Sequence, residues 1–420
     1  MRRSVLLAVF VAALSAAAAR TAEAQSYRTF AEEYDGLIRD ARLRVGPLLF
    51  FPSILLRDLG FDDNIYYDAA GRLIRDYHAT ISPEVTVYLP VRRTLITWFR
   101  ENPEYVFFLK QNHERSFKNS WGAGVRYLLF HRFILDAEYG REAHRRRVSR
   151  ELPIPADDIG ESWRAGFHYE TARRTSFGIS LFSQRLGYGN VTVGGTTTAL
   201  GRILSRLERG AQAEIYYQVF VDGYAFLIGR RVEYAFDDPS QFYRNSEVKS
   251  LDFGLRFPLL GRVRGTLNLG YKRLDPRAEG LRPYSGFSGD TGLDFRVGRV
   301  EFRLNYRRDL VFSAYEGTGY YIEDGVGGGI SFRLTRFFLL DYNYSTGRTA
   351  YPGQGGEAVA ESRSEGERTD RHRHQGFGLT IRLSDALGIN VGWSAYHWLS
   401  TAPGFDRRRN FFGVNLTTRI

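Results

Sequence analysis

Apolar and polar residues alternate along most of the chain. In the stretch RVEFRLNYRRD, residues 299–309, Val300, Phe302 and Leu304 occupy every second position, with charged or amide side chains between them. Successive side chains of a β-strand point to opposite faces, so this stretch predicts a strand with one apolar and one polar face. The pattern recurs in LDFGLRF (251–257), VRGTLNLGYK (263–272), FGLTIRLS (377–384) and LGINVGW (387–393). It predicts an all-β protein whose apolar faces meet either a protein core or lipid.

The connections between these strands fall into two classes. Short connections such as VDG (221–223) and VGR (297–299) alternate with long ones rich in Gly, Pro, Asp, Ser and Arg. The long connections lie near residues 61–75, 101–118, 142–161, 186–205, 236–247, 273–288, 311–319, 346–374 and 399–408. Their pairing indicates about nine hairpins and hence about eighteen antiparallel strands, with short periplasmic turns and long extracellular loops, as in outer-membrane β-barrels. We therefore expect a transmembrane β-barrel whose apolar faces meet lipid.

The N-terminus has the pattern of a secretory signal peptide. Arg2 and Arg3 precede an apolar stretch, and small residues at Ala22 and Ala24 mark a cleavage point before Gln25. We expect residues 1–24 to be removed during export to the outer membrane of a Gram-negative cell. The formal charge then falls from +11 to +9, because three Arg and one Glu leave with the peptide.

Two further segments follow from the same reasoning. Residues 25–46 are expected to form a periplasmic N-terminal segment, either a short helix or irregular, since apolar residues within 27–44 fall at helical spacing. Residues 47–420 are expected to form the barrel. After residue 24 no stretch approaches the ~20 apolar residues that a membrane helix needs, so any crossing must use strands.

Composition agrees with a β-rich protein and limits its chemistry. The chain has 44 Gly, 26 Tyr and 31 Phe but no Cys, so disulfides and thiolate metal sites are excluded. Aromatic residues near predicted strand ends are typical of membrane interfaces. They are Trp98, Trp121, Trp163, Tyr344 and Trp393.

The polar faces of the strands supply candidates for the lining of a pore. A barrel of sixteen to eighteen strands encloses an aqueous lumen, and arginines that line a pore favour anions. Inward cations by the strand register are Arg256, Arg264, Lys272, Arg296, Arg299, Arg303, Arg307, Arg333 and Arg382. Inward acids such as Asp294, Glu301 and Asp341 offer the alternative that most of these cations pair across strands and only brace the wall.

Catalysis, metal binding and nucleic-acid binding find little support. The chain has eight His, and HRH at 372–374 is read as part of a solvated loop rather than a metal site. We expect no enzyme activity, no cofactor, no metal and no nucleic acid as a partner. The segment 346–374 is the longest predicted loop, and it either folds into the lumen or projects outward.

The first predicted strands carry a family resemblance. LRVGPLLFFPSILLRDLGFDDNIYYD (43–68) and ISPEVTVYLPVRR (81–93) resemble the opening of the putative β-barrel porin 2 family of outer-membrane proteins. The matching residues are Gly46, Pro52, Ser53, Gly60, Asp62, Asp63, Asn64, Ile65, Pro83 and Pro90. The resemblance implies an outer-membrane pore, and relatives often accompany machinery for exopolysaccharide synthesis and export.

The expected function is therefore a pore that exports an exopolysaccharide or capsular polymer. The alternatives are a general or anion-selective diffusion porin and, from another class, a barrel enzyme or surface adhesin. Expected partners are outer-membrane lipid and lipopolysaccharide, the barrel-assembly machinery and periplasmic polysaccharide-export proteins. The expected cargo is a polysaccharide or a small anionic solute.

Overall fold

The computed structural model describes residues 29–67, 73–147, 151, 155–171, 174–193, 196–220, 223–259, 263–279, 282–315, 318–352, 368–384, 386–401 and 406–419. The predicted signal peptide, the terminal Ile420 and most of the 346–374 loop therefore lie outside the described residues. No helix in the described part is long and apolar enough to cross a membrane.

Long antiparallel strands make up nearly all of the described chain. The first half contributes β2 (Leu48–Asp62), β3 (Asp76–Val91), β4 (Leu95–Phe108), β5 (Ser116–Leu129), β6 (Phe133–Arg147), β7 (Pro155–Glu170), β8 (Thr175–Tyr188), β11 (Arg206–Phe220) and β12 (Gly223–Phe236). The second half contributes β13 (Ser246–Leu259), β14 (Val263–Pro276), β15 (Tyr284–Val297), β16 (Val300–Phe312), β17 (Tyr320–Arg333), β18 (Phe338–Ala350), β19 (Thr369–Arg382), β20 (Leu387–Ser400) and β21 (Arg407–Arg419).

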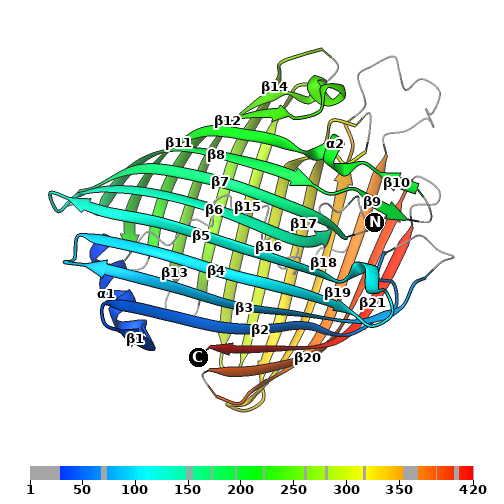
Figure 1. The fold of residues 1–420 in the computed structure, drawn as a ribbon, viewed down its shortest axis with the longest axis horizontal. Coiled ribbons are helices and arrows are strands. Elements are labelled where there is room, and N and C mark those ends of the chain that lie inside the picture. The colour runs from blue at the N-terminus through cyan, green and yellow to red at the C-terminus, as the bar shows by residue number, and fades with distance from the viewer. Residues whose placement is uncertain are drawn as a thin grey trace.

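These strands close into a ring (Figure 1). Each pairs with its neighbours in chain order, β8 pairs with β11, and β2 pairs with β21 to close the sheet. The main sheet has 19 strands, but the short β1 (Leu43–Val45) pairs only with β2, which leaves eighteen in the ring. The predicted fold class and strand number are confirmed.

Shorter elements lie at the two ends of the barrel. Helix α1 (Phe30–Asp40) precedes β1 at the end with the short turns. The end with the long loops carries η1 (Asn112–Glu114), the hairpin of β9 (Val191–Val193) and β10 (Thr196–Thr198), α2 (Leu200–Leu204) and η2 (Pro239–Arg244). In Figure 1, α1 is at the left end of the barrel and α2 is toward the right.

The outer face of the barrel is apolar, as the alternation predicts. Leu251, Phe253 and Leu269 are each more than half exposed, and Phe287 is 74% exposed. Soluble monomers rarely expose contiguous apolar surface beyond a few hundred Å². The many exposed apolar side chains around this ring therefore form the surface that meets lipid.

The strands are longer than the sequence pattern indicated. The predicted loops at 101–118 and 142–161 shrink to 109–115 and 148–154, because β4, β6 and β7 continue into them. These strand ends are rich in charged residues and lack the apolar alternation of the lipid-facing part. A strand that extends beyond the bilayer keeps its backbone ladder without needing an apolar face, so the pattern underestimates its length.

Two sequence interpretations of side chains are wrong. His372 and His374 lie in β19 rather than in a solvated loop, and they are buried against Trp398 and Tyr396. Trp98, expected at a membrane interface, belongs to the inward face. Its ring covers Gly122 and Gly124 of the next strand, where an added Cβ would lie 3.3 Å and 2.5 Å from ring atoms.

Candidate functional site: the lumen and its two mouths

Ion pairs between strands that are not neighbours identify the polar face as the inside of the barrel. Side chains two strands apart converge on the concave face of a curved sheet and diverge on its convex face. Among the described residues, such pairs include Arg57 with Glu104, Arg100 with Glu142 at 3.9 Å, Lys272 with Asp309, and Arg303 with Asp341 at 3.2 Å. His168, which is charged only when protonated, lies 3.4 Å from Glu214 in the same way. These pairs brace the wall from within.

A glycine on the intervening strand makes one of these approaches possible. His168 and Glu214 belong to β7 and β11, and Gly178 of β8 lies between them. A Cβ added at Gly178 would lie 2.5 Å from His168 Nδ1 and 2.9 Å from Glu214 Cγ. The lack of a side chain at this position therefore lets the two partners meet.

All nine predicted lining cations occupy inward register positions or the adjoining turns. Three of them pair with acids: Lys272 with Asp309, Arg296 with Glu301 at 3.2 Å, and Arg303 with Asp341. Their charges are locally balanced, as expected for residues that brace the wall.

The other six predicted cations differ in their contacts. Arg299 donates to the carbonyl of Leu334 at 3.4 Å, and Arg256 lies half-buried in β13. Arg264, Arg307, Arg333 and Arg382 have no carboxylate within ion-pair distance among the residues that the structure describes. Arg264 and Arg307 nevertheless face Asp294 and Asp290 of β15 in register, whereas Arg333 and Arg382 have no acid opposite them among the described residues. All four guanidiniums lie on the inner face, on β14, β16, β17 and β19, outside ion-pair distance of a carboxylate.

Helix α1 narrows the mouth at the short-turn end. A capping box starts the helix: the Thr29 hydroxyl accepts from the Glu32 amide at 3.3 Å, and the Glu32 carboxylate accepts from the Thr29 amide at 3.0 Å. Phe30, 1% exposed, packs against Ile96 and Ile134 on the inner face of β4 and β6. The helix therefore sits against the inner wall and takes up part of the opening.

Polar contacts hold α1 in this position. Glu33 pairs with Arg126 of β5, and Asp35 pairs with Arg93 at 2.7 Å in the turn after β3. The amide of Phe30 donates to the Glu170 carboxylate at the end of β7 at 3.1 Å. The sequence left this segment open as a helix or an irregular lead-in. The structure has a helix, and the residues at helical spacing, Phe30, Tyr34 and Leu37, are the ones that pack against the lumen wall.

The opposite mouth is crossed by a cap built from several long connections. Glu151, from the connection between β6 and β7, is fully buried. Its carboxylate accepts from the Ser313 hydroxyl at 2.7 Å and from the Ala314 amide at 2.5 Å, both in the connection between β16 and β17. Its carbonyl accepts from Arg407 of β21 at 3.1 Å. Because β7 and β16 are seven steps apart around the ring, these contacts span the opening.

Arg244 of η2 ties further connections into the cap. Its guanidinium is fully buried and donates to the carbonyls of Ile203 at 2.8 Å, Ser313 at 2.6 Å and Gly319 at 3.0 Å. Ala314 packs into an apolar cluster with Ile203 of α2 and other buried residues. The connection between β16 and β17 thus reaches across the lumen to the wall near β7 and β8.

Burial and the neighbouring polar groups shift the pKa of Glu151 in opposite directions. Burial raises the pKa of Glu151 to about 7. The hydrogen bonds from Ala314, Ser313 and Tyr351 and the positive charge of Arg368 act in the lowering direction. Burial also lowers the pKa of Arg244 to about 10. The cap therefore contains a carboxyl that titrates near neutral pH.

The described part of the chain holds no group of three or more His, Asp or Glu side chains placed to bind a metal ion. Sequence reasoning missed Glu151, Arg244 and the cap as a whole. The only local signal was Asp238 before Pro239, which starts η2 through a hydrogen bond to the Ser240 amide at 2.8 Å. Its contacts across the lumen depend on residues far apart in the sequence.

The chain matches the model of one protein family. A model of the family described as putative beta-barrel porin 2 matches residues 173–420, more than half of the chain. The chain belongs to this family. The resemblance to it is confirmed, although the matched span does not include the motif residues from Gly46 to Pro90. None of the curated proteins searched matches the porin.

Solved structures share its fold at low sequence identity. OccK2 (OpdF) from Pseudomonas aeruginosa is 10% identical with a TM-score of 0.53. The alignment covers 88% of this chain and 98% of the OccK2 chain. OpdL from the same organism is 12% identical with a TM-score of 0.51. The alignment covers 90% of this chain and 100% of the OpdL chain. The porin therefore shares the β-barrel fold of these channels.

These comparisons separate the functional alternatives only in part. A porin fits the family and the fold, and porins are channels rather than enzymes. Nothing in the comparisons supports export of an exopolysaccharide, so the diffusion porin named as an alternative fits better. Signal-peptide cleavage and the expected partners stay predictions.

Proposed function

We propose that this porin is a diffusion channel that favours small anionic solutes. The observation that carries the proposal is the set of four guanidiniums on the inner face without a carboxylate at ion-pair distance, Arg264, Arg307, Arg333 and Arg382. Cationic side chains that line a pore attract anions and repel cations, and guanidinium binds carboxylate or phosphate through paired hydrogen bonds. Paired cations such as Arg303 contribute less, because their acids cancel the field.

The two narrowed mouths support small solutes over a polymer. Helix α1 occupies part of one opening, and the cap around Glu151 and Arg244 crosses the other. A polysaccharide chain would need both obstructions to move aside together. A small solute would need a far narrower passage beside them.

Two channels of the same fold have been crystallised with small organic anions. OccK2 was solved in complex with glucuronate and OpdK with vanillate, both from Pseudomonas aeruginosa. Both ligands carry a carboxylate. This chemistry agrees with the solute class that the four inward arginines would attract.

Flux into liposomes tests the proposal. Protein beginning at Gln25 is reconstituted, and uptake is compared for an organic anion and an organic cation of equal size. One charge at about 4 Å in water is worth about 1 kcal/mol, or a factor of about five. The double variant Arg264→Gln/Arg307→Gln should therefore lose at least about fivefold of the anion preference.

A matched control removes a cation from the outer face. Arg185 is exposed there and pairs with Asp237 at 3.2 Å, so Arg185→Gln changes the net charge without touching the lumen. This variant should keep the wild-type preference. The proposal would be wrong if the wild type took up both ions equally, or if the double variant kept the wild-type preference for the anion.

A further inference from the structure

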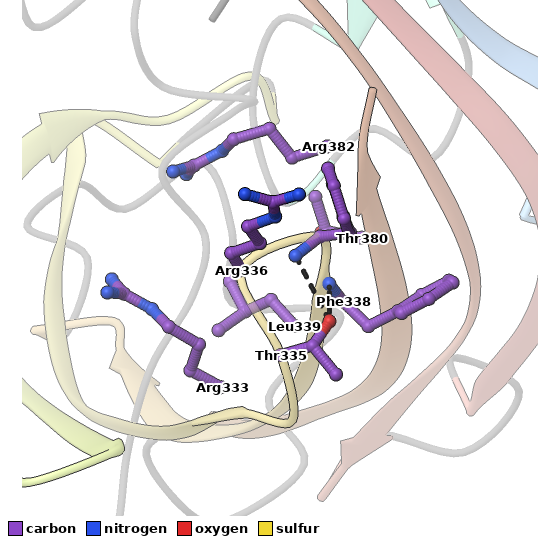
Figure 2. Close-up of a pocket in the computed structure, with 8 residues that line it drawn as sticks. Arg333, Thr335, Arg336, Phe338, Leu339, Thr380 and Arg382 are labelled. Atoms are coloured by element: carbon purple, nitrogen blue, oxygen red, sulfur yellow. Dashed lines mark hydrogen bonds between the residues drawn. The ribbon is translucent and has the colours of Figure 1, made fainter. Parts of the chain in front are cut away.

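Three arginines surround one pocket at the short-turn end of the barrel. The pocket is lined by Arg333 at the end of β17, Arg336 in the turn, Arg382 at the end of β19, and Thr335. Figure 2 shows the guanidinium of Arg336 lying between the side chains of Arg333 and Arg382. The three cations thus come from two strand ends and one turn and approach a common space.

The backbone of the turn holds this arrangement in place. The Thr335 hydroxyl accepts from the amides of Phe337 at 3.1 Å and Phe338 at 3.2 Å (Figure 2). The amide of Arg382 donates to the Phe337 carbonyl at 2.7 Å, which ties the end of β19 to the turn. Because the hydroxyl oxygen is the acceptor in both of these bonds, the hydroxyl can still donate its own proton to a ligand.

No acid among the described residues neutralises these three guanidiniums. The nearby Asp341 is already engaged, because it accepts from Arg303 at 3.2 Å and from Thr380 at 3.2 Å. Arg336 instead lies 4.5 Å over the Phe337 ring. Three like charges around one pocket repel one another, and a bound anion would relieve that repulsion.

We infer that Arg333, Arg336 and Arg382 form a binding site for a phosphate group at the periplasmic mouth of the lumen. Three guanidiniums and one hydroxyl offer many more donors than the roughly four acceptor sites of a carboxylate can use, whereas a phosphate presents more acceptor oxygens and a larger negative charge. Arg333 and Arg382 occupy inward positions, so the site faces solutes in transit. The placement of the site on the path of a transported solute rests on the proposed function. The inference adds the chemical class of that solute.

Calorimetric titration of the full detergent-solubilised protein with inorganic phosphate tests the site. Hydrogen bonds to charged groups contribute about 1.5–3 kcal/mol each, so loss of one guanidinium should weaken binding by at least about tenfold. We expect this loss for Arg336→Gln, whose turn position spares the barrel strands. The triple variant Arg333→Gln/Arg336→Gln/Arg382→Gln should abolish binding.

The control is Arg132→Gln, which removes an exposed arginine from the short turn between β5 and β6 at the same end. It should bind phosphate as the wild type does. Absence of binding by the wild type, equal binding by the triple variant, or an equal loss in the control would each overturn the site.

Two further measurements separate the site from its alternatives. Native mass spectrometry of purified protein detects a retained phospholipid; a phospholipid that inorganic phosphate cannot displace would overturn the assignment to a solute.

The selectivity of the channel for chloride over potassium is measured without phosphate. Anion selectivity without phosphate binding would reject the site alone, whereas phosphate binding in a channel without anion selectivity would reject the proposed function alone.

Discussion

Arg303 donates from Nη2 to Asp341 Oδ1 at 3.2 Å, although the two residues lie on β16 and β18 with β17 between them. The same nitrogen donates to Ser331 of the intervening strand at 2.6 Å. Asp341 therefore cancels much of the field that Arg303 would otherwise project into the lumen. A cation lining a pore acts on solutes only to the extent that no acid compensates it.

This relationship predicts that removing an acid strengthens anion selectivity. Asp341→Asn keeps the shape of the side chain and leaves Arg303 without its counter-charge. The anion-to-cation permeability ratio should rise by a factor of about five, the effect of one charge in water at close range. Reversal potentials in a salt gradient measure the ratio. A ratio that stays at the wild-type value would show that Arg303 does not face the conducting path.

The cap around Glu151 should depend on pH. Burial raises the pKa of Glu151 to about 7 in the closed cap, whereas an exposed glutamate titrates near 4.3. The buried, protonated form therefore stabilises the closed cap fully below about pH 4.3. That contribution declines as the pH rises from 4.3 through 7, and it amounts to roughly 4 kcal/mol. Single-channel current should be larger at pH 8 than at pH 5.

Two variants check the origin of this dependence. Glu151→Gln fixes a neutral side chain of similar shape, so its current should keep the low, pH 5 level at both values. Glu279→Gln, in another outer connection where the residue is exposed, should retain the wild-type response. A pH response that persists unchanged in Glu151→Gln would assign the titration to a different group.

Docking of α1 should depend on one aromatic side chain. Phe30→Ala removes a ring that is 1% exposed and packs against Ile96 and Ile134, a change that typically costs about 3–5 kcal/mol. The helix should then leave the wall and unfold more often, which raises conductance and speeds cleavage by trypsin after Arg39, whose side chain is already exposed. Leu43→Ala, at a site 50% exposed, serves as the control. Wild-type conductance and cleavage in Phe30→Ala would mean that other contacts suffice to hold α1.

Barrel stability should respond differently to two inward glycines. Gly178→Ala places a Cβ 2.5 Å from His168 Nδ1, so the pair with Glu214 must shift, at a cost of about 1–3 kcal/mol. An added Cβ at Gly292 meets nothing within 4 Å, so Gly292→Ala should be close to neutral. Urea unfolding in lipid vesicles measures both. Equal midpoints for the two variants would contradict the packing at Gly178.

The sequence predicts the barrel well because side chains alternate between the two faces of a strand, so apolar and polar residues repeat with a period of two. Val300, Phe302 and Arg303 already show which side chains face lipid and which face the lumen. The pattern does not reveal which cations are compensated, because Arg303 meets Asp341 across a whole strand. It also fails at His372 and His374, where the polar end of β19 resembles a loop. The contacts of Glu151 join connections on distant sides of the ring, so no local pattern encodes them.

The reversal potential of the wild-type channel tests the central claim most directly. Protein beginning at Gln25 is inserted into a planar bilayer with a tenfold gradient of potassium chloride. The inward arginines without an ion-pair partner, Arg264, Arg307, Arg333 and Arg382, predict a reversal potential displaced toward the chloride equilibrium value. A potential at zero, or one displaced toward the potassium value, would contradict an anion-favouring lumen.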